Sequence, residues 1–378
     1  MNLIKNIQPS ICILLFFVVL FFIYHIYYKY KPMYEGFSSG GFKEAFQSNI
    51  KSKQKKNVDV FEMSDRSVNG LPEYNYIEDI PTDERKSEPS NLIVNNASKV
   101  KFEKNPIENV EKNLEDPNIN FVFNDGKDIW TKFYCSIYDS LMLDNTKNKY
   151  EIKEIVFTTK MNKKSKVLDI GSGTGHHVHM FNKKGIDAVG MDSSLEMVKK
   201  AQENYPDSKF YNSDVMHSYQ FRKNEFTHAL MMFMTVYYIR DKTAAFHNVY
   251  NWLKPGGYMV IHLVNRDKFD PRIEAADPLY KVNPQIFSKE RITKSYVKFN
   301  DFQYKGEFVY NGGDQSKYVE TLKEDDGNKA IRNEHKYYME TQKEIINKAK
   351  SVGFKLKGKI NMDVCAYPYE YLYVFVKK

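Results

Sequence analysis

The chain has 378 residues, and its apolar (42%) and aromatic (15%) residues are numerous enough to form a substantial folded core. A mean hydropathy of −0.59 shows that polar residues are also abundant, which fits if they are concentrated in one segment. The net charge of +8 comes mainly from lysines scattered among Asn and Glu, so no specific nucleic-acid binding is expected.

The first element is an apolar run at residues 11–28, ICILLFFVVLFFIYHIYY, in which His25 is the only strongly polar interruption. About 18 residues is close to the shortest apolar stretch that crosses a bilayer as a helix, and tyrosines at its end favour the interface. A signal peptide would need small residues at a cleavage site, and a core helix would need polar positions at helical spacing. The run has neither, so we predict an N-terminal transmembrane anchor over residues 1–32.

The flanking charges predict how this anchor is oriented. Lys5 is the only charged side chain before the run, whereas Lys29 and Lys31 follow it directly. Positive residues favour the cytosolic side, so we expect a single-pass membrane protein whose C-terminal body faces the cytosol. A glycosylation sequon at Asn96 would matter only in a lumenal body. A reducing compartment also agrees with three cysteines that show no paired or metal-ligand spacing, Cys12, Cys135 and Cys365.

The next segment, from residue 36 to about residue 114, is rich in Ser, Asn, Lys, Glu and Pro. Its apolar residues are too sparse to form a periodic face, which is typical of a flexible tether. We therefore predict a disordered polar linker over residues 33–115 and a folded domain over residues 116–378. Regular structure is expected to begin near Phe121.

Short apolar strands then alternate with segments of helical periodicity. This alternation predicts an α/β fold, in which a mostly parallel sheet carries helices on both faces. Strands are expected at residues 166–170, 187–191, 209–212, 227–232, 258–264 and 370–376. Helices are expected at residues 194–202, 242–253 and 339–352, the last of them ended by Gly353.

One stretch departs from this alternation. Period-two runs at residues 304–310 and 317–322 are joined by Asn311-Gly312-Gly313-Asp314, which is the signature of a β-hairpin. We predict a small antiparallel β insertion over about residues 290–338, placed over the ligand-binding edge of the sheet.

The motif that carries most information is VLDIGSGTG at residues 167–175, where a buried strand runs into a glycine-rich turn and then a helix. Glycines let the backbone turn tightly and let a ligand approach it without interference from a Cβ atom. Many nucleotide-binding folds contain such a turn, so the pattern alone is weak. Here His176 replaces the last glycine of a dinucleotide fingerprint, and Asp169 suits a cationic ligand better than a pyrophosphate.

Three further features follow in order along the chain. Asp192 ends the second strand about 20 residues after the first glycine, where an acid receives two ribose hydroxyls in such folds. Asp214-Val215 follows the third strand, and Leu253-Lys254-Pro255-Gly256-Gly257 precedes the fifth. Together with the glycine turn, these residues resemble the class I (Rossmann-like) S-adenosylmethionine-dependent methyltransferase family, over about residues 134–378. The resemblance implies a seven-stranded sheet with an antiparallel last strand, and S-adenosyl-L-methionine as cofactor.

The resemblance also implies roles for single residues. Asp169 would help to hold the methionine amino group, Asp192 the ribose hydroxyls and Asp214 the adenine N6. Main chain at the end of the fourth strand would pass close to the cofactor. The remaining expected cofactor contacts are Gly171, Ser172, Gly173, Gly175, Ser193, Val215 and Met231, with Met232 beside the last.

Candidate catalytic residues stand near the carboxyl ends of the strands, where open α/β sheets bind ligands. The cofactor brings the reactivity, so alignment and desolvation matter more than one indispensable side chain. Tyrosine faces could hold a cationic amine, although packing is an alternative for each, and His262 is either a general base or a buried hydrogen-bonded histidine. The candidates are Tyr134, Tyr237 and His262, and Tyr138, Tyr238 and Asn265 stand close by.

His176 and His177 open the helix after the turn, but metal binding would need a third ligand, so we predict no metal.

The acceptor is the least defined part of the prediction. Methyltransferases of nucleic-acid amino groups often carry an Asn/Asp-Pro-Pro-aromatic motif after the fourth strand, whereas residues 231–234 read MMFM. The predicted insertion resembles the lids of small-molecule methyltransferases. We therefore predict a membrane-tethered methyltransferase with a small-molecule acceptor. Alternatives are a protein methyltransferase, a non-catalytic cofactor-binding or structural membrane protein, and a nucleotide-dependent oxidoreductase.

Overall fold

The computed structural model describes residues 119–276, 288–299, 302–324 and 329–378, together with Val110, Leu114 and Gln285. The predicted anchor over residues 1–32, almost all of the predicted linker and the sequon at Asn96 lie outside the described residues. No helix within the described ranges is long and apolar enough to cross a membrane.

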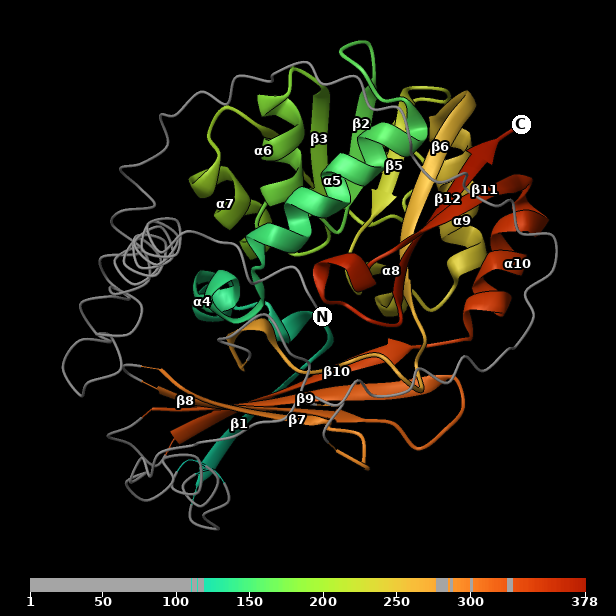
Figure 1. The fold of residues 1–378 in the computed structure, drawn as a ribbon. Coiled ribbons are helices and arrows are strands. Elements are labelled where there is room, and N and C mark those ends of the chain that lie inside the picture. Colours follow the sequence, from blue (N-terminus) through green and yellow to red (C-terminus); the bar gives the residue numbers. More distant parts are fainter. Residues whose placement is uncertain are drawn as a thin grey trace, which may run out of the picture. The chain divides into compact units, whose positions relative to one another are not determined.

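A seven-stranded sheet forms the centre of the described fold (Figure 1). Five neighbouring strands run parallel, and β12 lies antiparallel between β6 and β11, which confirms the predicted sheet and its antiparallel last strand. In spatial order the strands are β11 (Phe354–Asn361), β12 (Glu370–Lys377), β6 (Leu253–Val264), β5 (Phe226–Met231), β2 (Lys166–Ile170), β3 (Asp187–Asp192) and β4 (Lys209–Asn212).

Successive residues of a strand point to opposite faces of the sheet, and in this sheet both faces are buried. Val167 of β2 packs in one hydrophobic cluster with Val178, whereas the adjacent Leu168 packs in the other with Phe246. Helices therefore cover both faces, as the sequence predicts. Their bounds are α4 (Lys132–Met142), α5 (Asn145–Thr159), α6 (His176–Lys183), α7 (Leu195–Asn204), α8 (Thr235–Tyr238), α9 (Lys242–Trp252) and α10 (Gln342–Val352).

The six predicted strands are all present, and five of them match the predicted bounds to within one residue. Strand β6 starts earlier than expected, at Leu253, and β11 was not predicted. Helix α10 ends before Gly353, which adopts a φ of 115°, as expected for a glycine C-cap. It begins three residues later than predicted because Thr341 and Glu344 form a capping box that fixes the first turn.

A second sheet, here called the lid sheet, lies at the carboxyl ends of the parallel strands (Figure 1). The predicted hairpin is confirmed in β8 and β9, but the sheet has five strands and one parallel pair, β1 with β10. The prediction of a purely antiparallel insertion was therefore incomplete, since β1 precedes α4 in the chain. In spatial order the strands are β1 (Asn120–Asp125), β10 (Lys329–Tyr338), β9 (Gln315–Glu324), β8 (Phe302–Val309) and β7 (Lys294–Lys298).

Candidate functional site

The glycine turn connects β2 to α6. Gly171 and Gly173 adopt φ values of 70° and 50°, the left-handed conformation that favours glycine. A Cβ atom on Gly171 would lie 2.6 Å from the side chain of Thr235, whereas one on Gly173 would meet no atom within 4 Å. Gly171 is therefore needed for close packing against the start of α8. Gly173 faces open space, from which a ligand can approach the backbone.

Asp192, at the end of β3, is held beside this turn. Its Oδ2 accepts a hydrogen bond from the Gly173 N–H at 2.9 Å, and its Oδ1 accepts one from the Ser194 N–H at 2.9 Å. Burial raises the pKa of the Asp192 carboxyl, and the two backbone hydrogen bonds offset only part of that rise. The carboxylate thus links the glycine turn to the start of α7 in a fixed orientation.

A cavity of about 480 Å³ lies where these elements meet the lid sheet. Its lining unites the carboxyl ends of β2 and β3 and the residues directly after β5 with residues of α4, β9 and β10. Eight of the ten expected cofactor contacts line it, namely Asp169, Gly171, Ser172, Gly173, Asp192, Ser193, Asp214 and Val215.

Gly175 and Met231, the other two expected contacts, do not line the cavity. Gly175 is the N-cap of α6, and a Cβ atom there would lie 2.6 Å from the ring of Phe210, so packing accounts for this glycine. Met231 is the last residue of β5 and is completely buried in the hydrophobic core. The chain reaches the cavity only after β5 has ended, so Met232 and Phe233 line the cavity instead.

Five buried oxygens of lining residues have no hydrogen-bond partner among the described residues. Two are the hydroxyls of Tyr134 and Tyr318, and the other three are on the cofactor side of the cavity: Asp169 Oδ1, Ser172 Oγ and Ser213 Oγ. Asp169 is 1% exposed, and burial raises the pKa of its carboxyl to about 6. Buried polar atoms are normally paired, so these oxygens indicate where the donors of a ligand belong. A ligand that carries an ammonium group and hydroxyls, as S-adenosylmethionine does, fits this wall.

The part of the cavity next to the lid sheet is aromatic. The ring centroid of Trp130 lies 5.7 Å from that of Tyr134 and 6.0 Å from that of Tyr238. The imidazole of His335, on β10, lies 5.7 Å from Trp130 and 6.1 Å from Tyr134. Aromatic faces attract cations, so this wall suits a positively charged group. The other aromatic residues of the lining are Tyr138, Phe233, Tyr318 and Tyr337.

A chain of hydrogen bonds leads from this wall into the lid sheet. Tyr238 Oη lies 2.7 Å from His335 Nδ1, and His335 Nε2 lies 2.8 Å from Glu320 Oε2. Glu320 is completely buried on β9 and also accepts a hydrogen bond from Tyr304 Oη at 2.7 Å. Burial by itself would raise the pKa of Glu320, but the contact with His335 and the hydrogen bond from the Tyr304 hydroxyl together lower it. Because Glu320 accepts the Nε2 proton, neutral His335 presents Nδ1 as the acceptor for the Tyr238 hydroxyl.

Sequence reasoning missed His335 and Glu320. Both occupy inward positions of strands in which alternate residues are buried, His335 between Asn333 and Tyr337 on β10, and Glu320 between Tyr318 and Leu322 on β9. Polar residues at the buried positions of an amphipathic strand are the pattern that would have identified His335 and Glu320 from the sequence.

Two of the three predicted catalytic candidates, Tyr237 and His262, do not line the cavity. Tyr237 is fully buried, and its Oη accepts the N–H of Val264 at 2.8 Å. His262 is also fully buried, with Nδ1 2.7 Å from the Phe233 carbonyl oxygen and Nε2 2.9 Å from Glu370 Oε2. Both side chains are held in the packing around β6, away from the cavity, which for His262 agrees with the alternative of a buried hydrogen-bonded histidine.

Tyr134, the third candidate, lines the cavity, as do Tyr138 and Tyr238; Asn265 does not.

His176 and His177 line the cavity and face separate carboxylates. His176 Nε2 lies 3.0 Å from Asp139 Oδ2, and His177 Nε2 lies 2.8 Å from Glu151 Oε2. These contacts fix the start of α6 against α4 and α5. The described residues contain no group of three or more His, Cys, Asp or Glu side chains placed to hold a metal ion.

Comparison with known proteins gives the class of this site. Residues 167–257 match a protein-family model described as a methyltransferase domain. The matched range begins just before the glycine turn, includes Asp192 and Asp214, and ends at Gly257. Residues 167–257 therefore carry a methyltransferase domain, for which S-adenosylmethionine is the expected cofactor.

Curated relatives are similar over part of this chain and part of their own length. Phosphoethanolamine N-methyltransferase 1 of Arabidopsis thaliana is 31% identical over 143 residues, which cover 32% of this chain and 26% of the relative. The dTDP-3-amino-3,4,6-trideoxy-alpha-D-glucopyranose N,N-dimethyltransferase of Streptomyces venezuelae is 31% identical over 100 residues, which cover 26% and 41%. The chain thus spans well under half the length of either relative.

Among solved structures, an S-adenosylmethionine-dependent methyltransferase from Clostridium acetobutylicum ATCC 824 is similar to this chain with a TM-score of 0.49 and 18% identity. The similarity covers 65% of this chain and 98% of that chain.

Gly173→Val is expected to abolish binding of S-adenosylmethionine while the domain still folds, because the new side chain projects into the open space beside the turn. Gly185→Val is the matched control, since Gly185 also has a positive φ (73°) but lies outside the cavity lining. The left-handed conformation costs each variant about 1–2 kcal/mol of stability. Isothermal titration and thermal unfolding would check both, and undiminished affinity in Gly173→Val would contradict this placement of the ligand.

The affinity for S-adenosylmethionine is expected to depend on pH through Asp169. Its pKa of about 6 means that the carboxylate is ionised at pH 8 and becomes protonated as the pH falls through 6. Protonation removes the negative charge that faces the ligand's ammonium group, so affinity should fall by up to roughly tenfold per pH unit below that value. Titrations from pH 8 to pH 5 would measure this. Asp169→Asn should bind weakly with a flat profile, and a flat profile in the unmodified protein would refute the assignment.

Proposed function

We propose that this protein transfers a methyl group from S-adenosylmethionine to the amino group of a small molecule. The observation that carries the proposal is the aromatic wall with the buried Glu320 behind it, since both features favour a cationic amine. The two curated relatives described above are also named for N-methylation, one of phosphoethanolamine and the other of an amino sugar nucleotide.

When bound, S-adenosylmethionine supplies an electrophilic methyl group, which an amine attacks only as the neutral free base. The chain from Tyr238 to Glu320 can remove the extra proton of an ammonium group. The Tyr238 hydroxyl accepts that proton while it passes its own proton to His335 Nδ1, and Glu320 stabilises the imidazolium that results. Burial raises the pKa of Tyr238 well above its usual value, so this hydroxyl passes protons on and does not hold a charge.

A phosphate on the acceptor would find a partner at the edge of the cavity. Arg240 lines the cavity and is exposed, and the described residues provide no hydrogen-bond or ion-pair partner for it. A guanidinium binds phosphate oxygens in a bidentate manner, so Arg240 favours a phosphorylated amine as the acceptor.

A screen of methyl acceptors tests the proposal. The full-length protein would be incubated with S-adenosylmethionine and a panel of primary amines, phosphorylated amines, amino sugars, phenols, carboxylic acids and short peptides. Formation of S-adenosylhomocysteine and a mass gain of one methyl group on the amines are expected. Methylation confined to oxygen acceptors would exclude an N-methyltransferase, and transfer only to peptides would favour the protein-methyltransferase alternative. Cofactor binding with no transfer to any acceptor would favour a non-catalytic role.

We also propose that residues 1–32 tether the enzyme to a membrane, with the methyltransferase domain in the cytosol. The support is the apolar run at residues 11–28 and the lysines that follow it. Deletion of residues 1–32 is expected to move the protein from the membrane fraction to the soluble fraction, with methyl transfer retained. Fractionation of cells that express each form would show this, and a deleted protein that stays on membranes would contradict the anchor.

A further inference from the structure

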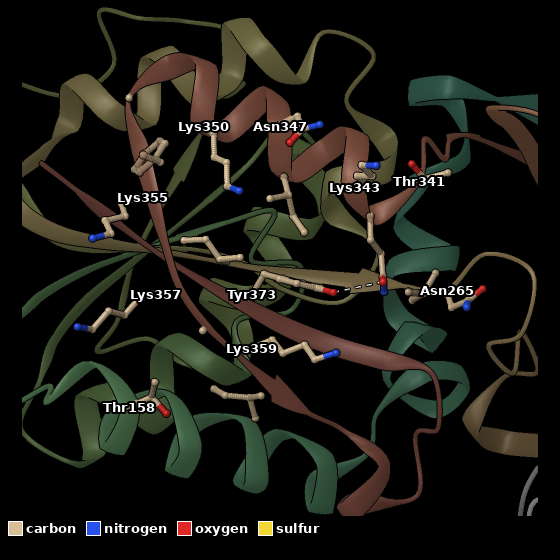
Figure 2. A pocket seen from close by; sticks show the side chains of 18 of the residues that line it. Thr158, Asn265, Thr341, Lys343, Asn347, Lys350, Lys355, Lys357, Lys359 and Tyr373 are labelled. Carbon is tan, nitrogen blue, oxygen red and sulfur yellow. Dashed lines mark hydrogen bonds between the residues drawn. The ribbon is translucent and has the colours of Figure 1, made fainter. Parts of the chain in front are cut away.

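A second hollow, of about 1830 Å³, shares no lining residue with the cofactor cavity. It follows β11, the outermost strand of the seven-stranded sheet, between the end of α5 and helix α10 (Figure 2). We call it the β11 groove. Neither the proposed methyl transfer nor the binding of its cofactor gives this groove a role.

The lining of the β11 groove is strongly basic. Asp267 is its only acidic side chain, whereas the whole chain has 56 basic and 48 acidic residues, so overall composition does not explain the charge. Arg266 is already paired with Asp314 at 2.7 Å. Seven lysines remain: six come from α10, β11 and the end of α5, namely Lys160, Lys343, Lys350, Lys355, Lys357 and Lys359, and the seventh is Lys378.

Most of these lysines are not neutralised within the molecule. Lys343, Lys350 and Lys355 are exposed and form no ion pair with any carboxylate of the described residues. Lys359 Nζ lies 4.5 Å from the ring centroid of Tyr371 and likewise has no carboxylate partner there. Like charges gathered in a groove repel one another and raise the local concentration of anions. The groove is therefore expected to attract an anionic ligand.

The lysines follow two elements of the groove. Lys355 and Lys359 lie on β11 on either side of a β-bulge, because the pairing of β11 with β12 shifts by one residue between Leu356 and Gly358. Lys343 and Lys350 are two helical turns apart on one side of α10, about 10.5 Å along its axis. An extended anionic chain that followed β11 would meet them in succession. Lysines on an edge strand also deter sheet-to-sheet aggregation, but this does not account for those on α5 and α10.

The floor of the groove provides backbone and apolar contacts. Strand β11 pairs only with β12 among the described strands, so its outer N–H and C=O groups are open to a further strand. Leu356 is half-buried beside the lysines, and Phe157, from α5, is 56% exposed. Nucleic acids favour arginine and several exposed aromatic faces, and this lining offers lysines and a single large exposed ring.

We propose that the β11 groove binds an extended acidic peptide segment of a partner protein, which adds as a further strand to β11. Asp or Glu side chains of the peptide would pair with Lys355 and Lys359, on either side of the bulge. Backbone hydrogen bonds give affinity, and the acidic side chains select the partner. A planar lipid surface would not reach the floor between the two helices.

The test uses the full-length protein and a fluorescein-labelled ten-residue peptide of alternating glutamate and valine. We expect saturable binding that weakens as salt is added. A triple variant, Lys355→Glu, Lys357→Glu and Lys359→Glu, should bind at least tenfold more weakly. A control with the same charge change outside the groove, Lys163→Glu, Lys164→Glu and Lys184→Glu, should change affinity less than twofold. Equal affinity in the two triple variants would overturn the proposal.

Two further measurements test strand addition itself. A peptide with proline in place of each valine loses the backbone N–H of every second residue and should bind at least tenfold more weakly. Hydrogen exchange of residues 354–361 should slow when the glutamate–valine peptide binds. Equal binding of the proline peptide, unprotected β11, or preferential binding of a single-stranded oligonucleotide or of anionic vesicles would each overturn the proposal. None of these outcomes depends on methyl transfer, so the proposed function is tested separately.

Discussion

Replacing Glu320 with glutamine is expected to lower kcat at least a hundredfold, with little change in the affinity for S-adenosylmethionine. The carboxylate accepts the Nε2 proton of His335 at 2.8 Å, and this leaves Nδ1 free to accept the proton of Tyr238. An amide that donates to Nε2 would move the imidazole proton to Nδ1, so His335 could no longer act as the base. General-base catalysis commonly contributes roughly 10²–10⁴-fold to a rate. Steady-state kinetics and titration with the cofactor would separate the two effects.

The pH dependence distinguishes this role from a structural one. At high pH the amine arrives as the free base, so part of the rate lost in Glu320→Gln should return, whereas a misfolded lid sheet would not recover. Glu307→Gln on the neighbouring strand is the matched control, because Glu307 pairs with Lys305 and does not line the cavity. A normal kcat in Glu320→Gln would mean that the amine loses its proton to solvent or to another group.

Asp192→Ala is expected to weaken binding of S-adenosylmethionine by about 1–3 kcal/mol, because charge-assisted hydrogen bonds to the ribose hydroxyls are lost. The structure adds a second reason. The same carboxylate accepts the backbone N–H groups of Gly173 and Ser194, so its removal also frees the glycine turn and the start of α7. Affinity should therefore fall toward the upper end of this range, and isothermal titration would measure it.

Asp192→Asn provides the comparison for this second effect. The asparagine keeps one oxygen acceptor for a backbone N–H but loses the charge, so its affinity should lie between that of the unmodified protein and that of the alanine variant. If both variants bind the cofactor normally, the ribose lies elsewhere in the cavity. Thermal unfolding of each variant would show how much of the change comes from the loosened turn.

The sheet and the glycine turn could be predicted because their signals are local. A buried strand, a turn that requires glycine and a helix start follow one another within residues 166–183. The carboxylates at Asp169, Asp192 and Asp214 stand directly at strand ends, so their convergence follows from the rule that parallel strands bring their carboxyl ends together. Each of them lines the cavity.

The acceptor side of the cavity could not be predicted in the same way, because its parts come from distant segments. Trp130, Tyr238, Glu320 and His335 meet only after the lid sheet has folded over the strand ends. Tyr237 and Tyr238 show the limit of sequence reasoning most clearly. The short helix α8 directs one into the core and the other into the cavity, and only the three-dimensional path of that helix decides which.

The parallel pairing of β1 with β10 joins a segment that precedes residues 167–257 in the sequence to one that follows them. The side chains of Asn124 and Asn333 are hydrogen-bonded at 3.0 Å although they are 209 positions apart in the sequence. During synthesis on the ribosome, β1 emerges early but has no partner until β10 has been translated. Closing so long a loop is entropically costly and slow. We therefore expect a nascent or refolding chain to form the glycine turn and the strand ends around it well before the lid sheet encloses the acceptor side of the cavity.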